Sequence, residues 1–182
     1  MPRSARIDFP GAKHHVMNRG ARGENVFLDE SYCSQFLLLM SRAVERYGIR
    51  VHGFAIMPNH FHLMVESVEG NLGEAMKYVT SQYGFFLNAE MGWDGQVFRG
   101  RYKNKPVYLE QHWIYLLAYL HLNPVRARLV HEPEDALWTS HQAYLGRGRG
   151  LDWLTTEDLS EYFDTEKGTY PAYCSFDEKL ID

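Results

Sequence analysis

The sequence predicts an α+β fold in which helices pack on one antiparallel sheet. Three observations favour this class. Apolar residues alternate along several short stretches, they recur at helical spacing along three longer stretches, and a tight turn joins two of the short ones. With 182 residues, of which 45% are hydrophobic and 23% charged, the chain has the length and composition of a globular domain with its own core.

Each predicted element is identified by the period of its apolar residues and by the residues that end it. In chain order, the elements are a strand at 13–18, a helix at 29–47, strands at 49–56 and 61–66, a helix at 71–91, a strand–loop–strand unit at 96–108 and a helix at 110–122.

End residues set the limits of the three helices. Asp29 and Asn71 are suited to N-terminal caps, and Gly48 and Gly92 are suited to the position that follows a last helical turn. The third helix is expected to end near Asn123, because a residue that precedes proline avoids the helical region.

The strands at 49–56 and 61–66 are separated only by a turn at Pro58-Asn59, and so short a connection permits only an antiparallel pair. The order β-α-β-β-α-β, followed by a helix, is the ferredoxin-like split βαβ arrangement. We expect one domain at 1–145. The remaining residues, 146–182, form an acidic C-terminal extension that packs on the core or is loosely tethered to it, with a short helix at 155–163.

Net charge is −4 for the whole chain, but it is unevenly distributed. Nine acidic residues follow Leu151, whereas residues 1–150 hold 17 basic and 14 acidic residues. A mildly basic body with an acidic tail does not exclude a nucleic-acid partner. A tail that is merely solvated is an equally good interpretation of the asymmetry.

Neither a membrane span nor a disulfide framework is expected. The longest apolar stretch, 113–122, has about half of the ~20 residues that a span needs, and the N-terminus has no apolar signal segment. Cys33 and Cys174 are expected to be free thiols in a reducing cytoplasm.

The stretch MPNHFHLMVE (57–66) places two histidines in a predicted strand. His60 and His62 share one face, with Cα atoms about 7 Å apart, while Phe61 and Leu63 face the core. The two imidazoles can converge on one metal ion. A histidine–x–histidine pair also arises by chance, so a purely structural role stays open, and a third ligand must come from elsewhere.

The third predicted helix supplies candidates for that ligand and for a nucleophile. Tyr115, Tyr119 and Asn123 recur every four residues and therefore share a face. An asparagine oxygen is a hard neutral ligand, and a phenol can act as a nucleophile. Core packing is the favoured interpretation for Tyr115; for Tyr119 the spacing leaves core packing and catalysis equally open.

The stretch VFRGRYKNK (97–105) alternates cations with aromatic residues and holds no acidic residue. Its cations are Arg99, Arg101, Lys103 and Lys105. Phosphates bind arginine and lysine, and unstacked bases bind aromatic faces. The segment is a candidate DNA contact, although lysines on a solvated sheet edge also protect against aggregation.

Four motifs in order resemble a known family. They are NRG (18–20), MPNHFHLMVE (57–66), FRGRYKNKPV (98–107) and YLHLNPVRARLV (119–130). Together they resemble the IS200/IS605-like single-tyrosine (HUH) transposases, and above all the branch associated with repetitive extragenic palindromes (REP). The similarity runs from about Gly11 to Leu145, and the acidic tail matches none of it.

The resemblance implies a role for each candidate residue. The metal site is formed by His60, His62 and Asn123, the nucleophile is Tyr119, and DNA contacts come from Arg99, Arg101, Lys103 and Lys105, with Arg19 a weaker candidate. The implied cofactor is Mg²⁺ or Mn²⁺, with Zn²⁺ chemically possible. The implied partner is single-stranded DNA with REP-like hairpins, bound by a monomer or a homodimer in the cytoplasm, near the nucleoid.

The implied activity is that of a metal-dependent endonuclease and transesterase that cleaves and rejoins DNA through a 5′-phosphotyrosine. Two hydrolase classes fit the sequence less well. Histidine-triad nucleotide hydrolases need a third histidine where Met64 stands, and two-histidine phosphoesterases need a pair of H-x-[ST] motifs that is not evident. The alternative from another class is a non-catalytic protein that recognises palindromic DNA.

Overall fold

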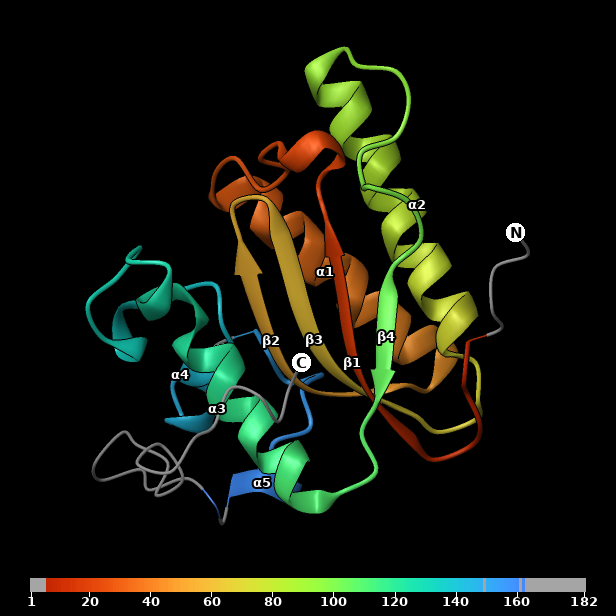
Figure 1. Ribbon diagram of the computed structural model, residues 1–182. Helices are drawn as coiled ribbons and strands as arrows, with labels where there is room; N and C mark the ends of the chain where they lie inside the picture. Colours follow the sequence, from red (N-terminus) through yellow and green to blue (C-terminus); the bar gives the residue numbers. More distant parts are fainter. Residues whose placement is uncertain (1–5, 149, 161, 163–182) are drawn as a thin grey trace.

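The computed structural model describes residues 6–148, 150–160 and 162. Its strands are β1 (Ala12–Arg19), β2 (Arg50–Met57), β3 (His60–Ser67) and β4 (Lys103–Pro106), and its α-helices are α1 (Glu30–Tyr47), α2 (Leu72–Met91), α3 (Glu110–Arg126), α4 (His141–Tyr144) and α5 (Glu157–Ser160). These strands form one antiparallel sheet in the order β2-β3-β1-β4 (Figure 1). The predicted α+β fold of the ferredoxin-like type is confirmed.

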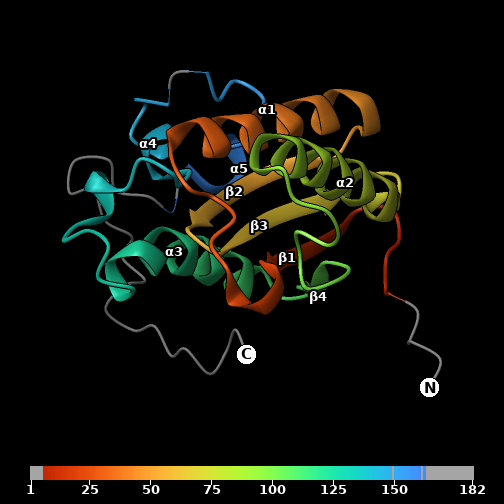
Figure 2. The same ribbon diagram turned by 90° about the horizontal axis from the view of Figure 1, so that it is seen from above.

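The sheet lies between two helical layers, with α1 and α2 on one face and α3 on the other (Figure 2). Because successive side chains of a strand point to opposite faces of the sheet, β3 contributes residues to the packing on both sides. Phe61, Leu63 and Val65 are buried in the core beneath α1 and α2, whereas Met64 packs in a second apolar cluster with residues of α3. The two histidines of β3 share the face of Met64 and therefore lie on the side of α3.

The elements that lead to β3 form as predicted. The Asp29 carboxylate accepts a hydrogen bond of 2.8 Å from the backbone N–H of Ser31 and so begins α1. Gly48 ends the helix with a φ of +62°, a conformation that glycine adopts without steric cost. The turn at residues 58–59 then joins β2 to β3 as an antiparallel hairpin.

The predicted end of the third helix at Asn123 is wrong, because α3 continues through Pro124 to Arg126. A proline in the last turn removes one backbone N–H donor but leaves the carbonyls of that turn available. Those carbonyls are used: the N–H of Ala127 donates to Asn123 O at 3.0 Å, and that of Leu129 donates to Pro124 O at 2.9 Å.

Asn71 stands at the predicted start of α2, but its side chain does not cap the helix. Its amide instead donates a hydrogen bond of 2.8 Å to the carbonyl of Tyr47, at the end of α1. The first N–H of α2, on Leu72, is satisfied by two other side chains, the carboxylate of Asp8 at 3.0 Å and the hydroxyl of Ser67 at 3.1 Å. Capping therefore comes from Ser67, at the end of β3, and from Asp8, which is remote in the sequence.

The predicted strand–loop–strand unit at 96–108 holds only one strand, β4. Its first half makes a single bridge between Phe98 and Gly20 instead of a ladder. Gly95 and Gly100, with φ of +97° and +124°, turn the chain on either side of that bridge. The segment is nevertheless anchored, since the N–H of Arg99 donates to Arg19 O at 2.8 Å.

The described part of the C-terminal extension packs on the sheet. Leu154 is buried and forms a parallel bridge with Val51, and the N–H of Thr155 donates to Val51 O at 2.9 Å. The helix predicted at 155–163 is shorter, residues 157–160, and Phe163 lies outside the described residues, as does Cys174. Among the helices that the structure describes, none combines the length and the apolarity that a membrane crossing requires.

Candidate active site

Three imidazoles meet on the face of the sheet that α3 covers. His60 and His62 come from β3, and His15 comes from β1, which pairs with β3. Nε2 of His15 lies 2.9 Å from Nδ1 of His62, and the ring centroids of His60 and His62 are 5.0 Å apart with perpendicular planes. The strand register thus produces a histidine cluster that neither β1 nor β3 could form alone.

Hydrogen bonds fix the orientation of the His60 ring and the nitrogen that carries its proton. Nδ1 of His60 lies 2.6 Å from Oδ1 of Asn59, and the Asn59 amide nitrogen donates to the carbonyl of Gly23 at 3.2 Å. The asparagine oxygen is therefore the acceptor, so Nδ1 of His60 carries the proton and Nε2 keeps its lone pair. Within the described residues, Nε2 forms no hydrogen bond on either His60 or His62.

Burial keeps this cluster neutral. Burial and the nearby guanidinium of Arg19 lower the pKa of His60. The pKa of His62 lies well below its ordinary value, because of burial and the neighbouring imidazoles. Burial lowers the pKa of His15 to about 3, with a further contribution from the charge of Lys105. Neutral imidazoles are the form that binds a metal ion.

Helix α3 places a phenol against this cluster. The ring of Tyr119 lies edge-on to His62 at 5.7 Å between centroids and to His15 at 6.1 Å. The guanidinium carbon of Arg126 lies 5.7 Å from the centre of the Tyr119 ring. Tyr115 is one turn away, and its hydroxyl accepts a hydrogen bond of 2.7 Å from Gln111. The two tyrosines therefore occupy different surroundings.

Asn123 follows Tyr119 by one helical turn and is half-buried. Its backbone carbonyl accepts a hydrogen bond from Ala127, but among the described residues no hydrogen bond joins its side chain to His60 or His62. The structure thus brings together His62 and Tyr119, and places Asn123 one turn further along the same helix, without a hydrogen bond to the imidazoles among the described residues.

A cleft of about 560 Å³ opens beside the histidines. It is lined by Met17, Asn18, Arg19, His60, His62, Arg99, Arg101 and Lys103. Four of these residues are exposed cations and none is acidic. Four of the five basic residues predicted to contact DNA thus line one cleft with the histidine pair. The fifth, Lys105, lies opposite His15 in the β1–β4 ladder and does not line the cleft.

Helix α3 is held against β2 by a close approach and a polar anchor. A Cβ atom on Gly53 would lie 2.8 Å from Cδ1 of Leu117, so only glycine leaves room for the helix here. Behind the helix, Nε2 of His121 lies 2.7 Å from the hydroxyl of Ser140, which in turn accepts a bond of 3.0 Å from the N–H of Phe54. Together they fix the position of Tyr119 relative to the sheet.

A second group of ligand-type side chains lies at the far end of β3. The ligand atoms of His52, Glu66 and Asp158 all lie within 4.8 Å of one another. Glu66 is six residues from His60 along the strand, roughly 20 Å away, and it also pairs with Arg50 at 3.7 Å. This group is therefore separate from the imidazoles that face Tyr119.

Sequence reasoning missed His15, Asn59 and Arg126. A signal for His15 was present, since KHHVMN predicts a strand and an antiparallel partner would place one of its histidines beside those of β3. The sequence marks Asn59 only as a turn residue. Arg126 was missed because the helix was expected to end before it.

Paired imidazoles that face a helical phenol beside a cationic cleft form a candidate phosphoryl-transfer site for DNA. Residues 9–121 match the family described as "Transposase IS200 like". The chain therefore belongs to the IS200-like transposase family, and as such it is a DNA strand transferase. The family resemblance of the sequence motifs is confirmed. None of the curated proteins matches the sequence.

One solved structure agrees with the fold. The structure of a REP-associated tyrosine transposase bound to a REP hairpin matches with a TM-score of 0.68 and 14% identity, over 85% of this chain and 92% of that one. At this identity the likeness shows a shared fold. A putative transposase from Deinococcus radiodurans matches with a TM-score of 0.46 and 13% identity, over 65% of this chain and 95% of that one.

Proposed function

We propose that this transposase cleaves and rejoins single-stranded DNA beside hairpins, with Tyr119 as nucleophile and a divalent ion at His60 and His62. The observation that carries the proposal is the ring of Tyr119 at 5.7 Å from that of His62, a residue that itself lines the cleft together with four cations. This arrangement supports the assignment of a nucleophile, a pair of metal ligands and phosphate-binding groups to neighbouring residues.

The donor set fits a divalent ion. Each imidazole has one nitrogen held by a neighbour, His60 by Asn59 and His62 by His15, and the other nitrogen outside any hydrogen bond within the described residues. Such partners orient ligating histidines. With the amide of Asn123 as a third ligand, the set suits Mg²⁺ or Mn²⁺. When bound, the ion would withdraw charge from a phosphate oxygen and stabilise the departing 3′-oxygen.

Tyr119 performs the chemical step in this proposal. Its phenolic oxygen attacks the phosphorus, the bond from phosphorus to the 3′-oxygen breaks, and the phenolic proton is lost while the 3′-oxygen gains one. A free tyrosine has a pKa of ~10, so the phenol needs help at neutral pH. The guanidinium of Arg126, 5.7 Å from the centre of the ring, would attract the incoming phosphate.

The covalent product is a 5′-phosphotyrosine and a free 3′-hydroxyl. Because the ester retains the energy of the phosphodiester, a second 3′-hydroxyl can attack it and rejoin the strand without a nucleotide triphosphate. The exposed cations Arg19, Arg99, Arg101 and Lys103 hold the phosphates on either side of the reacting one. Residues 1–145 form the catalytic unit in this proposal, and residues 146–182 extend it.

Hairpin DNA is the proposed substrate because the matching transposase structure holds a REP hairpin. The test is incubation of the full chain with hairpin oligonucleotides from around its own gene, followed by denaturing electrophoresis. We expect a protein–DNA adduct that disappears with chelator and returns with Mn²⁺. Tight hairpin binding without any adduct would instead favour a non-catalytic palindrome-binding protein.

A further inference from the structure

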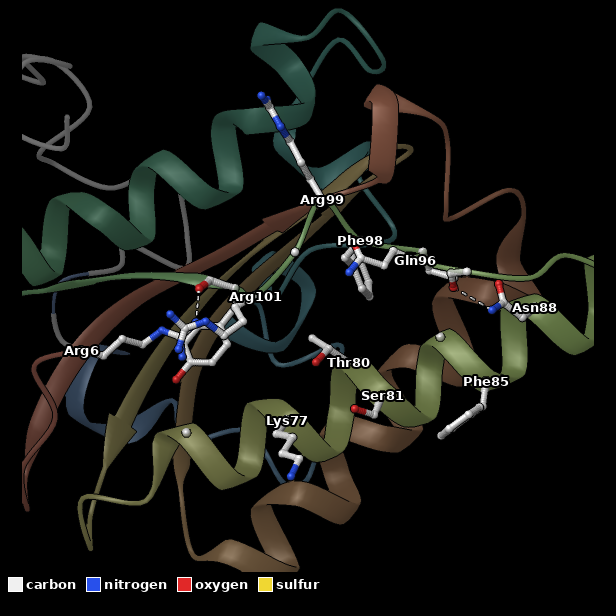
Figure 3. A pocket seen from close by; sticks show the side chains of 16 residues that line it. Arg6, Lys77, Thr80, Ser81, Phe85, Asn88, Gln96, Phe98, Arg99 and Arg101 are labelled. Carbon is white, nitrogen blue, oxygen red and sulfur yellow. Dashed lines mark hydrogen bonds between the residues drawn. The ribbon is translucent and has the colours of Figure 1, made fainter. Parts of the chain in front are cut away.

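A second cavity, of about 700 Å³, adjoins the cleft on the side of α2. One wall is α2, with Lys77, Thr80, Ser81 and Phe85, and the other is the segment 95–102 (Figure 3). Arg99 and Arg101 line both this groove and the active-site cleft, so the two are adjacent. We refer to this cavity as the α2 groove.

The lining of the α2 groove matches a polyanion with flat rings. Of the sixteen described residues that line it, four are cations, Arg6, Lys77, Arg99 and Arg101, and none is acidic. Phe85 stands at its rim with 71% of its surface exposed. Phosphates bind such cations, and an exposed aromatic ring offers a stacking surface to an unpaired base.

The α2 groove is built before any ligand arrives. Asn88 donates a hydrogen bond of 3.0 Å to the carbonyl of Gly95, which ties the segment 95–102 to α2. Arg6 stacks at 3.9 Å from the centre of the Tyr102 ring and donates to the Tyr102 carbonyl at 2.8 Å. Buried Val97 and Phe98 form its floor. A preformed groove loses little conformational entropy when it binds a flexible strand.

Gly84 supplies an independent observation. It lies in the interior of α2, where glycine lowers helix stability relative to alanine. The protein itself leaves room for a side chain, since the nearest atom to a Cβ on Gly84 would be Cγ2 of Val97 at 3.9 Å. The missing side chain keeps the wall of the α2 groove open, which points to a ligand that occupies this space.

We infer that the α2 groove binds the single-stranded DNA that flanks the hairpin, next to the phosphate cut in the cleft. This inference rests on the proposed function. The strand leaves the cleft past Arg99 and Arg101, its phosphates meet Lys77, and a base stacks on Phe85. A paired stem does not fit this description, because its bases have no free face for the phenylalanine.

The test compares two DNA probes, a hairpin with single-stranded tails and the same hairpin without tails, by fluorescence anisotropy with the full chain. Phe85→Ala should weaken binding of the tailed hairpin about tenfold and leave the tailless one unchanged. Lys77→Ala should reduce the slope of log affinity against log salt for the tailed hairpin by about one, the effect of losing one phosphate contact. Leu38→Ala and Arg42→Ala, at exposed positions of α1 outside the groove, are the matched controls.

The variant Gly84→Ala shows whether Gly84 serves DNA binding or the stability of α2. We expect this variant to melt at a higher temperature and yet to bind the tailed hairpin several-fold more weakly. Equal losses on both probes would assign the α2 groove to the stem, and no loss on either would remove it from DNA binding; both results overturn the inference. The adduct assay is read separately: wild-type protein without an adduct contradicts the proposed function, whereas tail-specific losses still support the groove.

Discussion

Nε2 of His15 lies 2.9 Å from Nδ1 of His62, across the β1–β3 pair. One proton is shared between these two atoms. When His62 Nδ1 carries it, Nε2 of His62 is left with a lone pair for a metal ion, and the His15 ring acts as the acceptor. His15 is therefore a partner that orients the proposed ligand, although it does not belong to the histidine–x–histidine motif.

We predict that His15→Leu weakens Mn²⁺ binding to the full chain by about 10–100-fold, the usual effect of losing a residue that orients a ligating histidine. Electron paramagnetic resonance of free Mn²⁺ measures the affinity without reference to activity. His131→Leu, at an exposed histidine away from the cleft, is the control. Unchanged affinity in the His15 variant would show that His62 does not depend on it.

Tyr119→Phe should abolish the covalent DNA adduct and leave hairpin binding nearly unchanged, because it removes only the attacking oxygen. Tyr115→Phe, one helical turn away, should retain the adduct, since its hydroxyl contacts Gln111 rather than the histidines. Denaturing electrophoresis detects the covalent adduct, and fluorescence anisotropy measures the affinity for the hairpin. The assignment fails if the Tyr119 variant still traps DNA and the Tyr115 variant does not.

Arg101→Ala should weaken hairpin binding at low salt and reduce the slope of log affinity against log salt by about one. The reason is that Arg101 is an exposed cation shared by the cleft and the α2 groove. Arg50→Ala is the control, because Arg50 pairs with Glu66 at the far end of the sheet. Titrations at several salt concentrations measure both slopes, and equal slopes would remove Arg101 from the phosphate contacts.

Acidification should destabilise the protein through His121. Burial, with a further contribution from His141, holds the pKa of His121 well below its ordinary value of 6.5. Below pH 6.5 this histidine binds a proton in the unfolded chain but stays neutral in the folded chain. The free energy of unfolding therefore falls by about 1.4 kcal/mol per pH unit for each such histidine. The loss continues until the pH reaches the folded pKa.

His121→Gln should therefore be less stable than wild type near neutral pH but less sensitive to acid. Thermal unfolding at about pH 7 and about pH 5 measures the difference, since an ordinary histidine changes charge in this window. The same loss of melting temperature in variant and wild type would show that another group causes the acid sensitivity.

Gly53→Ala should destabilise the fold by about 1–3 kcal/mol, as expected for an overpacked core. The added Cβ would meet Leu117 at 2.8 Å, Met64 at 3.2 Å and Ser140 at 3.3 Å. Gly73→Ala, where the nearest atom is 3.9 Å away, is the matched control. Denaturant unfolding measures both; a neutral Gly53→Ala would mean that α3 can move away from β2 without cost.

Local patterns were sufficient for most of the fold. Helix α1 begins and ends where its cap residues predicted, and the β2–β3 hairpin follows from the short turn between two alternating stretches. The predictions failed at two helix ends, where the hydrogen bonds that form differ from those that the residue types suggest. Asn71 turns to Tyr47 instead of capping α2, and the backbone bonds of the last turn carry α3 past Pro124.

The sequence alone determined that His60 and His62 share a face, because a strand alternates its side chains, and that Tyr119 and Asn123 share a side of a helix. Motif resemblance, not spacing, chose Tyr119 over Tyr115. Only the tertiary structure decided that α3 covers the histidine face, that β1 adds His15, and that the cations of residues 99–103 line the same cleft. The physical reason is that periodicity fixes where a side chain points on its own element, whereas the partner it meets depends on strand register and helix packing between residues far apart in the chain.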